Sequence, residues 1–495
     1  MSSNRPNILF IITDHHAYYG HDRPGEFDYK LPNFEKLAAE GLKFDRAYSV
    51  QPICTPARAS MLTGVYPSKH GMIQNTGHRM SLREFRKDQK LFNSYLEDAG
   101  YRNAYVGKWH CGDEKLAVDY GWEGWSLPKY GKIYMSDAYK EYCKERGFGN
   151  AQANIEEHLN YPEFNGQTVT LHHESPWRFM NAFGTLEGPP EAHEEQFVAH
   201  LACEKMKELA ANGQPWSLVA SFWGPHHPYF PSEPFASMVD PLSIPEYPSF
   251  RDDLRGRPFR HLIHQELIHP SAGTWTEWST WQRILARAYE QGYQTDAAVG
   301  SVLETLDELG QRENTIVVCL ADHGDIVASH GGQWDKSSCF SEEVARVPMA
   351  IRWPTGFEGG KMTAKLVSNM DATATILDAA GIATPAGMDS RSLFPLCEEP
   401  DKMDWPDQLI CEHSGKTEPI TQRIIIKGPW KYIAAVHDGD EFYNLDDDPF
   451  EMKNLIDSPA HAGVLKELQR EIIKHIHEHN DELGQRLALR LESGW

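Results

Sequence analysis

The chain has 495 residues, with 48 Lys and Arg against 71 Asp and Glu, and its formal net charge is −23. We expect no nucleic-acid partner, because proteins bind nucleic acid by neutralising phosphates with basic side chains. No apolar run approaches the roughly 18 residues that cross a bilayer, so we expect no membrane partner either. The first residues lack a secretory signal pattern, and the eight cysteines are scattered without a CxxC pair. We therefore expect a cytoplasmic protein with reduced thiols.

Short apolar runs alternate with helical patterns along most of the chain. Five runs predict buried strands: Asn7–Thr13, Ala104–Val106, Ser217–Trp223, Thr315–Ala321 and Val347–Trp353. Their continuous apolarity is typical of a sheet that is covered on both faces. A helical pattern over 296–309 stops before Gly310. Together these elements predict an α/β fold with a largely parallel central sheet flanked by helices.

The amino-acid composition and the predicted elements change at two points along the chain. Residues 158–281 are rich in His, Trp and Pro, and within a catalytic domain of 1–400 they predict a loop-rich insertion on the substrate side of the sheet. Residues 401–495 predict a small antiparallel β subdomain followed by an amphipathic terminal helix. The expected strands are Leu409–Glu412, Arg423–Lys427, Trp430–Ala434 and Glu441–Asn444, and the helix places Leu465, Leu468, Ile472, Ile473 and Ile476 on one face. Because that face can serve self-association, we expect a homo-oligomer.

An acidic residue and a histidine follow each of two predicted strands. Asp14 and His15 follow the first strand, and Asp322 and His323 follow the fourth. In α/β sheets, ligands bind beyond the carboxyl ends of the strands, so the two pairs can converge on one divalent cation. Carboxylates suit Ca²⁺, Mg²⁺ or Mn²⁺, and imidazole also suits Zn²⁺. The alternative is that each Asp caps a turn and each His lies on the surface.

The segment CTPAR predicts a helix that begins near Cys54. Pro56 suits the first turn of a helix, so the Cys54 thiol is expected at a helix N-terminus, where an anion is favoured. Arg58 adds a fixed planar cation one turn on. On these grounds Cys54 is either a nucleophile with a lowered pKa or a buried structural cysteine, and neither reading is preferred.

Further basic and imidazole side chains follow the other predicted strands. Lys108 and His110 lie two residues apart, so on an extended segment they point to the same face. His226 lies in a Pro-His-His-Pro segment after the third strand, and Lys336 lies shortly after the second Asp-His pair. Each of these signals is weak alone. Together they predict cations and imidazoles gathered around one cysteine.

The segment CTPARASMLTGVYPSKHG resembles the signature of the type I sulfatases, Cys-x-Pro-Ser/Ala-Arg. The blocks RPNILFIITD, GKWH, PHHP, TIVVCLADHG, WDK and FYNLDDDPFEMKNL fall in the order of that family, over about 5–455. The resemblance implies an alkaline-phosphatase-like fold and a sulfatase of the arylsulfatase type. Phosphonate monoester hydrolases and phosphodiesterases are close relatives of that family, and they remain the alternative function.

The resemblance also implies the cofactors. Cys54 would be oxidised by a formylglycine-generating maturation enzyme to formylglycine, whose hydrate is the nucleophile. One divalent metal ion would be bound, Ca²⁺ first, with Mn²⁺ or Mg²⁺ as alternatives. The family's ligand positions fall on Asp14, His15, Asp322, His323 and the modified Cys54. His15 departs from the commoner second Asp of the family.

The remaining site residues are carried over in the same way. Arg58, Lys108 and His110 match residues that hold the formylglycine, and His226 and Lys336 match residues around the sulfate and the leaving group. By a looser alignment, Asn75 matches a substrate-contacting Asn of the phosphonate hydrolases.

The implied mechanism treats a small-molecule sulfate ester as the substrate. One hydroxyl of the hydrate, deprotonated toward Asp322, attacks sulfur, and His226 or Lys336 protonates the leaving alcohol. His110 then takes a proton from the second hydroxyl so that sulfate is eliminated. Such sites are often promiscuous between sulfate and phosphate esters, and Lys108 favours sulfate.

Overall fold

A large twisted sheet forms the centre of the molecule. The computed structural model describes residues 5–18, 27–171, 178–262, 277–336, 338–416 and 420–493. The eight strands of the sheet have the order β12-β2-β11-β10-β1-β9-β4-β5. They are β1 (Asn7–Thr13), β2 (Leu42–Phe44), β4 (Arg102–Lys108), β5 (Glu123–Leu127), β9 (Trp216–Ser221), β10 (Thr315–Ala321), β11 (Met349–Arg352) and β12 (Lys361–Thr363). β10, β1, β9, β4 and β5 are parallel, whereas β11 is antiparallel to both neighbours. The predicted α/β class is confirmed.

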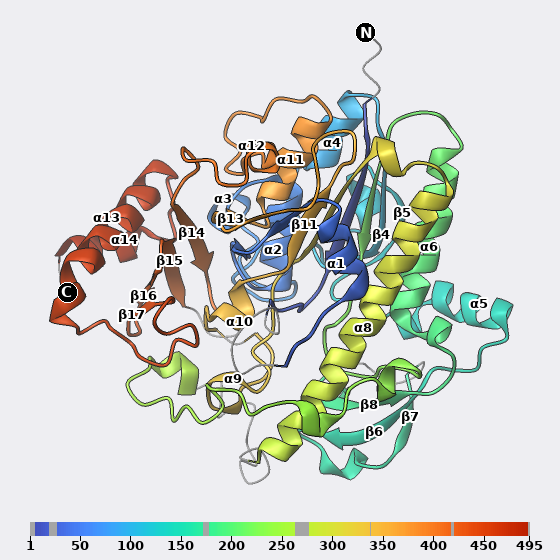
Figure 1. Ribbon diagram of the computed structural model, residues 1–495, viewed down its shortest axis with the longest axis horizontal. Helices are drawn as coiled ribbons and strands as arrows, with labels where there is room; N and C mark the ends of the chain where they lie inside the picture. The colour runs from blue at the N-terminus through green and yellow to red at the C-terminus, as the bar shows by residue number, and fades with distance from the viewer. Residues whose placement is uncertain are drawn as a thin grey trace.

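Helices cover both faces of this sheet (Figure 1). The α-helices of the described residues, including those that do not contact this sheet, are α1 (Pro32–Ala39), α2 (Cys54–Thr63), α3 (Pro67–His70), α4 (Phe92–Asp98), α5 (Asp137–Arg146), α6 (Glu194–Ala210), α8 (Trp278–Glu308), α9 (Ser329–Gly332), α10 (Glu342–Ala345), α11 (Asp371–Ala379), α12 (Phe394–Glu398), α13 (Ala462–Glu478) and α14 (Gln485–Ser493). Alternate residues of β1 enter different cores, as strand geometry requires. Leu9 and Ile11 pack in the core shared with α6 and α8, and Phe10 packs in the core shared with α2 and α11.

The predicted strands are all present, and β1 and β10 have the predicted bounds. The helix expected over 296–309 is only the last part of α8, which begins at Trp278. The apolar pattern fails earlier because α8 buries polar side chains there. Gln291 Oε1 accepts a hydrogen bond from Phe230 N at 2.8 Å, and Gln294 Oε1 accepts one from Ser232 N at 2.9 Å. These side chains hold a loop rather than fill a core.

Residues 158–281 combine loops with parts of the central body. A small antiparallel sheet of β6 (Gln152–His158), β7 (Thr168–Thr170) and β8 (Ala182–Leu186) lies at the start of this range. The range also contains α6 and β9, a strand in the middle of the main sheet. The range therefore includes a strand that pairs with β1 and β4 as well as loops, and its place on the substrate side of the sheet stays a prediction. Residues 172–177 and 263–276 of the expected insertion lie outside the described residues.

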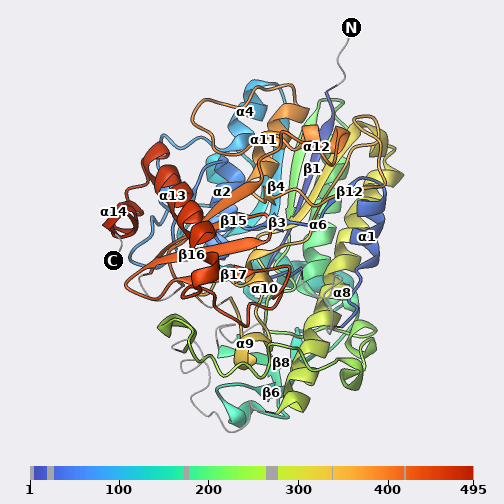
Figure 2. The same cartoon turned by 60° about the vertical axis from the view of Figure 1, so that its left-hand side comes forward.

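A second sheet of four antiparallel strands follows, as the sequence predicts. Its strands are β14 (Gln408–His413), β15 (Thr421–Lys427), β16 (Trp430–Val436) and β17 (Glu441–Asn444). A short parallel pair joins β3 (Ala47–Tyr48), which follows β2 in the chain, to β13 (Val367–Ser368), which follows β12. Figure 2 shows α13 lying across the small sheet.

The apolar face of α13 is used inside the chain. Leu468, Ile472 and Ile476 pack with Ile425 and Tyr432 of the small sheet. The face that suggested self-association is therefore covered, and the homo-oligomer stays a prediction without that support. All eight cysteines are buried, and none forms a disulfide. Among the described helices, none has the length and apolarity needed to cross a membrane.

The small sheet is tied to the segment after α13 by a buried ion pair. Arg423 of β15 reaches Asp481 with Nε at 2.6 Å and a second nitrogen at 2.7 Å, and both side chains are inaccessible to solvent. We expect Arg423→Met to lower the free energy of unfolding by about 3–5 kcal/mol, because Asp481 would be left buried without its cation. Urea denaturation measures this loss.

Lys427→Met is the matched control, because its ion pair with Glu467 is partly exposed. We expect a change of less than about 1 kcal/mol for this variant. Equal losses for the two variants would contradict the role given to the buried pair.

Candidate active site

The predicted site residues meet at the carboxyl-terminal edge of the main sheet. β1 and β10 pair in register, with Thr13 opposite Ala321, so Asp14 and Asp322 leave the sheet side by side. Cys54 is the first residue of α2, as Pro56 predicted. This edge is where α/β sheets place their ligands.

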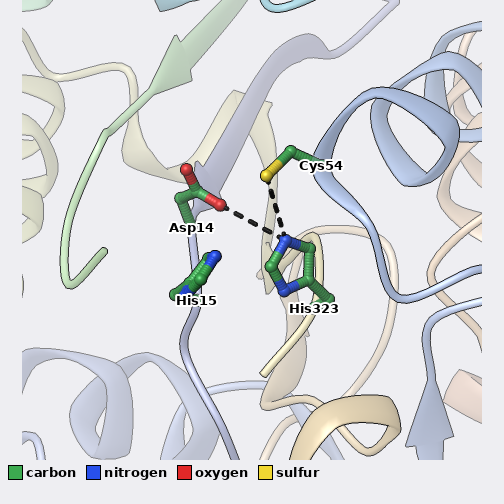
Figure 3. A group of neighbouring side chains, drawn as sticks. All are labelled: Asp14, His15, Cys54 and His323. Atoms are coloured by element: carbon green, nitrogen blue, oxygen red, sulfur yellow. Dashed lines mark hydrogen bonds and ion pairs between the residues drawn. The ribbon is translucent and has the colours of Figure 1, made fainter. Parts of the chain in front are cut away.

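Four ligating side chains form the centre of the site (Figure 3). The donor atoms of Asp14, His15, Cys54 and His323 all lie within 4.8 Å of one another. His323 Nε2 lies 3.2 Å from Cys54 Sγ and 3.6 Å from the nearer oxygen of Asp14. None of the four residues is more than 2% exposed. The alternative reading of the two histidines as surface residues is therefore wrong.

Asp322 borders this group but uses its carboxylate differently. Its Oδ2 accepts a hydrogen bond from Arg58 Nε at 2.7 Å, and its Oδ1 accepts one from His323 N at 2.8 Å. Arg58 is buried and also donates to Lys108 O and to Ser221 Oγ, at 3.0 and 2.6 Å. Arg58 thus links α2 to the ends of β10, β4 and β9.

Buried cations compensate the buried acids of the site. Lys108 forms an ion pair with Asp14, and both side chains are fully buried. Burial alone would raise the pKa of Asp14, but Lys108 and nearby His226 and Arg58 hold it well below its usual value. The carboxylate of Asp14 is therefore ionised at neutral pH.

The Cys54 thiol experiences the same field. Burial and the charge of Asp14 act to raise its pKa, but Lys336, Lys108 and His323 outweigh them, and the pKa of Cys54 is lowered. Cys54 is buried as the structural reading required, and it also faces the charged group as the chemical reading required.

His110 reaches the site by a route that differs from the prediction. β4 ends at Lys108, and His110 has a φ of 49°, so the segment is not extended there. The turn, rather than strand alternation, directs its ring. Burial lowers the pKa of His110, and Lys108 lowers it further, so the ring is neutral. Among the described residues, its buried Nδ1 has no hydrogen-bond partner.

Asn75 supports the start of α2. Its Oδ1 accepts a hydrogen bond from Thr55 N at 3.1 Å, next to Cys54. Thr55 Oγ1 in turn donates to His110 O at 2.7 Å. The contact of Asn75 with a substrate stays a prediction.

His226 and Lys336 lie on the other side of the centre. The ring of His226 lies 3.7 Å from that of His15, centroid to centroid. Its Nδ1 donates to the carbonyl oxygen of His227 at 2.5 Å. Lys336 Nζ contacts His15 Nε2 and lies 3.0 Å from Asp335 Oδ1. All the predicted side chains except Asn75 thus share one buried electrostatic cluster.

Sequence reasoning missed four residues of the site. Asp325 contacts His15 Nδ1 at 2.9 Å, Asp335 pairs with Lys336, Ser221 binds Arg58, and the ring of Tyr130 lies 4.3 Å from Lys108 Nζ. Asp325 lies three residues after Asp322, and Ser221 lies within the predicted strand Ser217–Trp223, so both positions were available signals. Tyr130 offered none.

Comparisons with known proteins agree with this architecture. The family model for sulfatases matches residues 6–382, and a model described as N-sulphoglucosamine sulphohydrolase, C-terminal, matches residues 329–478. The chain is 26% identical to N-acetylglucosamine-6-O-sulfatase from Bacteroides thetaiotaomicron, covering 94% of this chain and 86% of the relative. It is 25% identical to an arylsulfatase from Clostridium perfringens, covering 95% and 94%.

A solved structure supports the fold. The phosphonate monoester hydrolase from Silicibacter pomeroyi superposes with a TM-score of 0.76 at 22% identity, covering 97% of this chain and 96% of that one.

The family model and the curated sulfatase relatives define a hydrolase of the sulfatase and alkaline-phosphatase-like superfamily. Within it, the chain belongs to the sulfatase family, whose reaction is the hydrolysis of sulfate esters.

Proposed function

We propose that this chain hydrolyses sulfate monoesters through a formylglycine formed from Cys54, beside one bound divalent cation. The observation that carries the proposal is the position of Cys54. It begins α2 within the segment CTPAR, and its Sγ shares one buried group with donor atoms of Asp14, His15 and His323. A formylglycine-generating enzyme would carry out the maturation before the chain folds, because folded Cys54 is buried.

The donor set fits a divalent cation. Asp14 Oδ1 is buried and, in the part of the chain that the structure describes, has no hydrogen-bond donor. Asp14, His15, His323 and the side chain at position 54 would hold the ion, with Asp322 beside them. Carboxylate suits Ca²⁺, which we propose first, and the imidazoles also suit Mn²⁺. When bound, the ion supplies positive charge against the ester oxygens and the nucleophile.

The protein's own cations prepare the site for an anion. A sulfate ester resists attack because its oxygens repel a nucleophile, so those oxygens need local positive charge. Arg58 has one nitrogen that is buried without a hydrogen-bond partner among the described residues, so its guanidinium can still donate to a sulfate oxygen. Lys108 and Lys336 add charge within a chain whose net charge is −23.

The hydrate of a formylglycine supplies one hydroxyl that attacks sulfur and a second that allows sulfate to leave without another attack on sulfur. We assign the second deprotonation to His110, whose neutral ring has a buried Nδ1 that accepts no hydrogen bond from a described residue. The neutral state is what a general base requires.

Lys336 is the better donor to the leaving oxygen. His226 already donates its Nδ1 proton to His227 O, so its Nε2 carries a lone pair. Lys336 has three protons and no acceptor, and Asp335 raises its pKa although burial lowers it. His226 is then left to orient the ester, with its ring packed on His15.

The alcohol part of the ester has an apolar pocket next to the site. The pocket is lined by Tyr130, Ile133, Tyr134, Phe179, Trp223 and Phe230, and Glu194 lies on its wall. Tyr130 connects it to the centre through Lys108 and His226, at 4.3 and 5.1 Å from its ring. Such a lining suits an aryl or other apolar alcohol.

Maturation of Cys54 is tested by peptide mass spectrometry combined with kinetics. We expect an aldehyde or its hydrate at position 54 in protein from its native host. Cys54→Ala should reduce kcat with 4-nitrophenyl sulfate by at least about 10⁴-fold, because the nucleophile is removed. Cys203→Ala, at another buried cysteine, should keep the activity. Full turnover by Cys54→Ala would refute the proposal, and a higher kcat/KM for phenyl phenylphosphonate than for the sulfate would favour the phosphonate hydrolase.

The role of His110 is tested by the time course of the first turnover. His110→Ala should release 4-nitrophenol in a burst of about one equivalent and then stop, because the sulfated enzyme accumulates. Intact-mass measurement should detect the added sulfate at position 54. Steady turnover without a burst would contradict the assignment.

Glu194 gives the pocket a pH dependence. Burial raises its pKa to about 7, against the lowering effect of Lys108. The side chain is neutral below that pH and ionised above it, where its charge disfavours an apolar alcohol. KM for 4-nitrophenyl sulfate should therefore rise severalfold between pH 6 and 8, and Glu194→Gln should remove the rise. An unchanged KM profile in this variant would show that Glu194 does not border the bound alcohol.

A further inference from the structure

His15 has a buried acidic partner on the side away from the site centre. Its Nδ1 lies 2.9 Å from Asp325 Oδ2, and the two side chains are 0% and 1% exposed. Asp325 is not one of the residues that contribute to the four-residue group around Cys54. It lies at the start of the loop that follows β10, three residues after Asp322.

The two contacts of the imidazole fix its tautomer. Lys336 Nζ contacts His15 Nε2, and a lysine ammonium can only donate hydrogen bonds. Nε2 is therefore the acceptor nitrogen, and the proton resides on Nδ1, where Asp325 accepts it. Nε2 therefore carries the lone pair, which contacts Lys336 here and is the donor that His15 can offer to a cation held with Asp14, Cys54 and His323. A neutral ring with this tautomer is the form of histidine that binds a metal ion.

Asp325 is itself held in place. Tyr229 Oη donates to Asp325 Oδ2 at 3.0 Å, and Val327 N donates to Asp325 Oδ1 at 3.3 Å. The backbone at His15 adds a further restraint, because its φ of 58° lies in the left-handed region. The orientation of the His15 ring is thus restrained both by its own backbone conformation and by the fixed carboxylate of Asp325 at Nδ1.

We propose that Asp325 is a positioning residue for the divalent cation and acts only through His15. The inference rests on the cation in the proposed function. A histidine that binds a metal commonly donates its other N–H to a carboxylate, which orients the ring and makes its free nitrogen more basic. In this chain the neutral imidazole of His15 occupies the position where the sequence resemblance expects a carboxylate ligand. The negative charge is instead on Asp325, which contacts the other nitrogen of that ring.

The test is a double-mutant cycle on metal affinity. Calcium and manganese titrations, by isothermal calorimetry on chelator-treated protein, would compare wild type, Asp325→Ala, His15→Ala and the double variant. We expect Asp325→Ala to raise the Kd by about 10–100-fold. In the His15→Ala background the same substitution should change the Kd by less than about threefold, because the intermediary is gone.

Two further variants keep the result specific. Asp325→Asn retains an acceptor for the Nδ1 proton without the charge, so its loss of affinity should be smaller than that of Asp325→Ala. Tyr229→Phe removes the other donor to the same oxygen but leaves the His15 contact, and its Kd should stay within about threefold of wild type. Thermal unfolding of the metal-free proteins identifies any variant that fails to fold.

The outcomes distinguish the positioning role of Asp325 from the existence of the cation site itself. Tight binding by wild type with an unchanged Kd in Asp325→Ala and Asp325→Asn would overturn the positioning role alone. An equal loss in the presence and absence of His15 would also overturn it, because Asp325 would then act on the ion directly. A wild-type chain without measurable affinity for either ion would overturn the cation of the proposed function together with this inference.

Discussion

The need to neutralise charges that are removed from water governs the structure of the site. An isolated buried ion costs several kcal/mol, and a pair is tolerated only when its geometry is good and its remaining hydrogen bonds are satisfied. Asp14 is matched by Lys108, Asp322 by Arg58 and Asp335 by Lys336. The first pair joins the ends of β1 and β4, and the second joins the end of β10 to α2. The third lies within the loop that follows α9. The ion pairs that set the charge of the site therefore also hold the strand ends and α2 together.

This constraint explains which parts of the site the sequence revealed. Asp14 and Asp322 were predictable because each directly follows a strongly apolar strand, and register pairing then places them side by side. Cys54 and Arg58 were predictable because Pro56 starts a helix. His110 was assigned to the site by resemblance, but its positive φ could not be inferred from strand periodicity.

Other elements show where local pattern fails for physical reasons. Most of α8 was not predicted, because Glu290, Gln291 and Gln294 are buried to bind backbone groups of a loop. The central strand β9 was predicted as a strand, although the surrounding residues 158–281 read as an insertion. Hydrophobic periodicity identifies residues that pack in an apolar core, but it does not identify buried polar side chains that hydrogen-bond to a loop.

The polar residues of α8 have an evolutionary consequence. Gln291 Nε2 donates to His226 O at 2.8 Å and Gln294 serves the backbone of Ser232, so the path of the loop is set by the helix rather than by the loop's own side chains. Substitutions along the loop can then alter the wall of the apolar pocket next to the site while the backbone that carries His226 keeps its path. Related enzymes can therefore acquire new ester specificities through substitutions in this loop, while the hydrogen bonds from α8 keep its backbone in place.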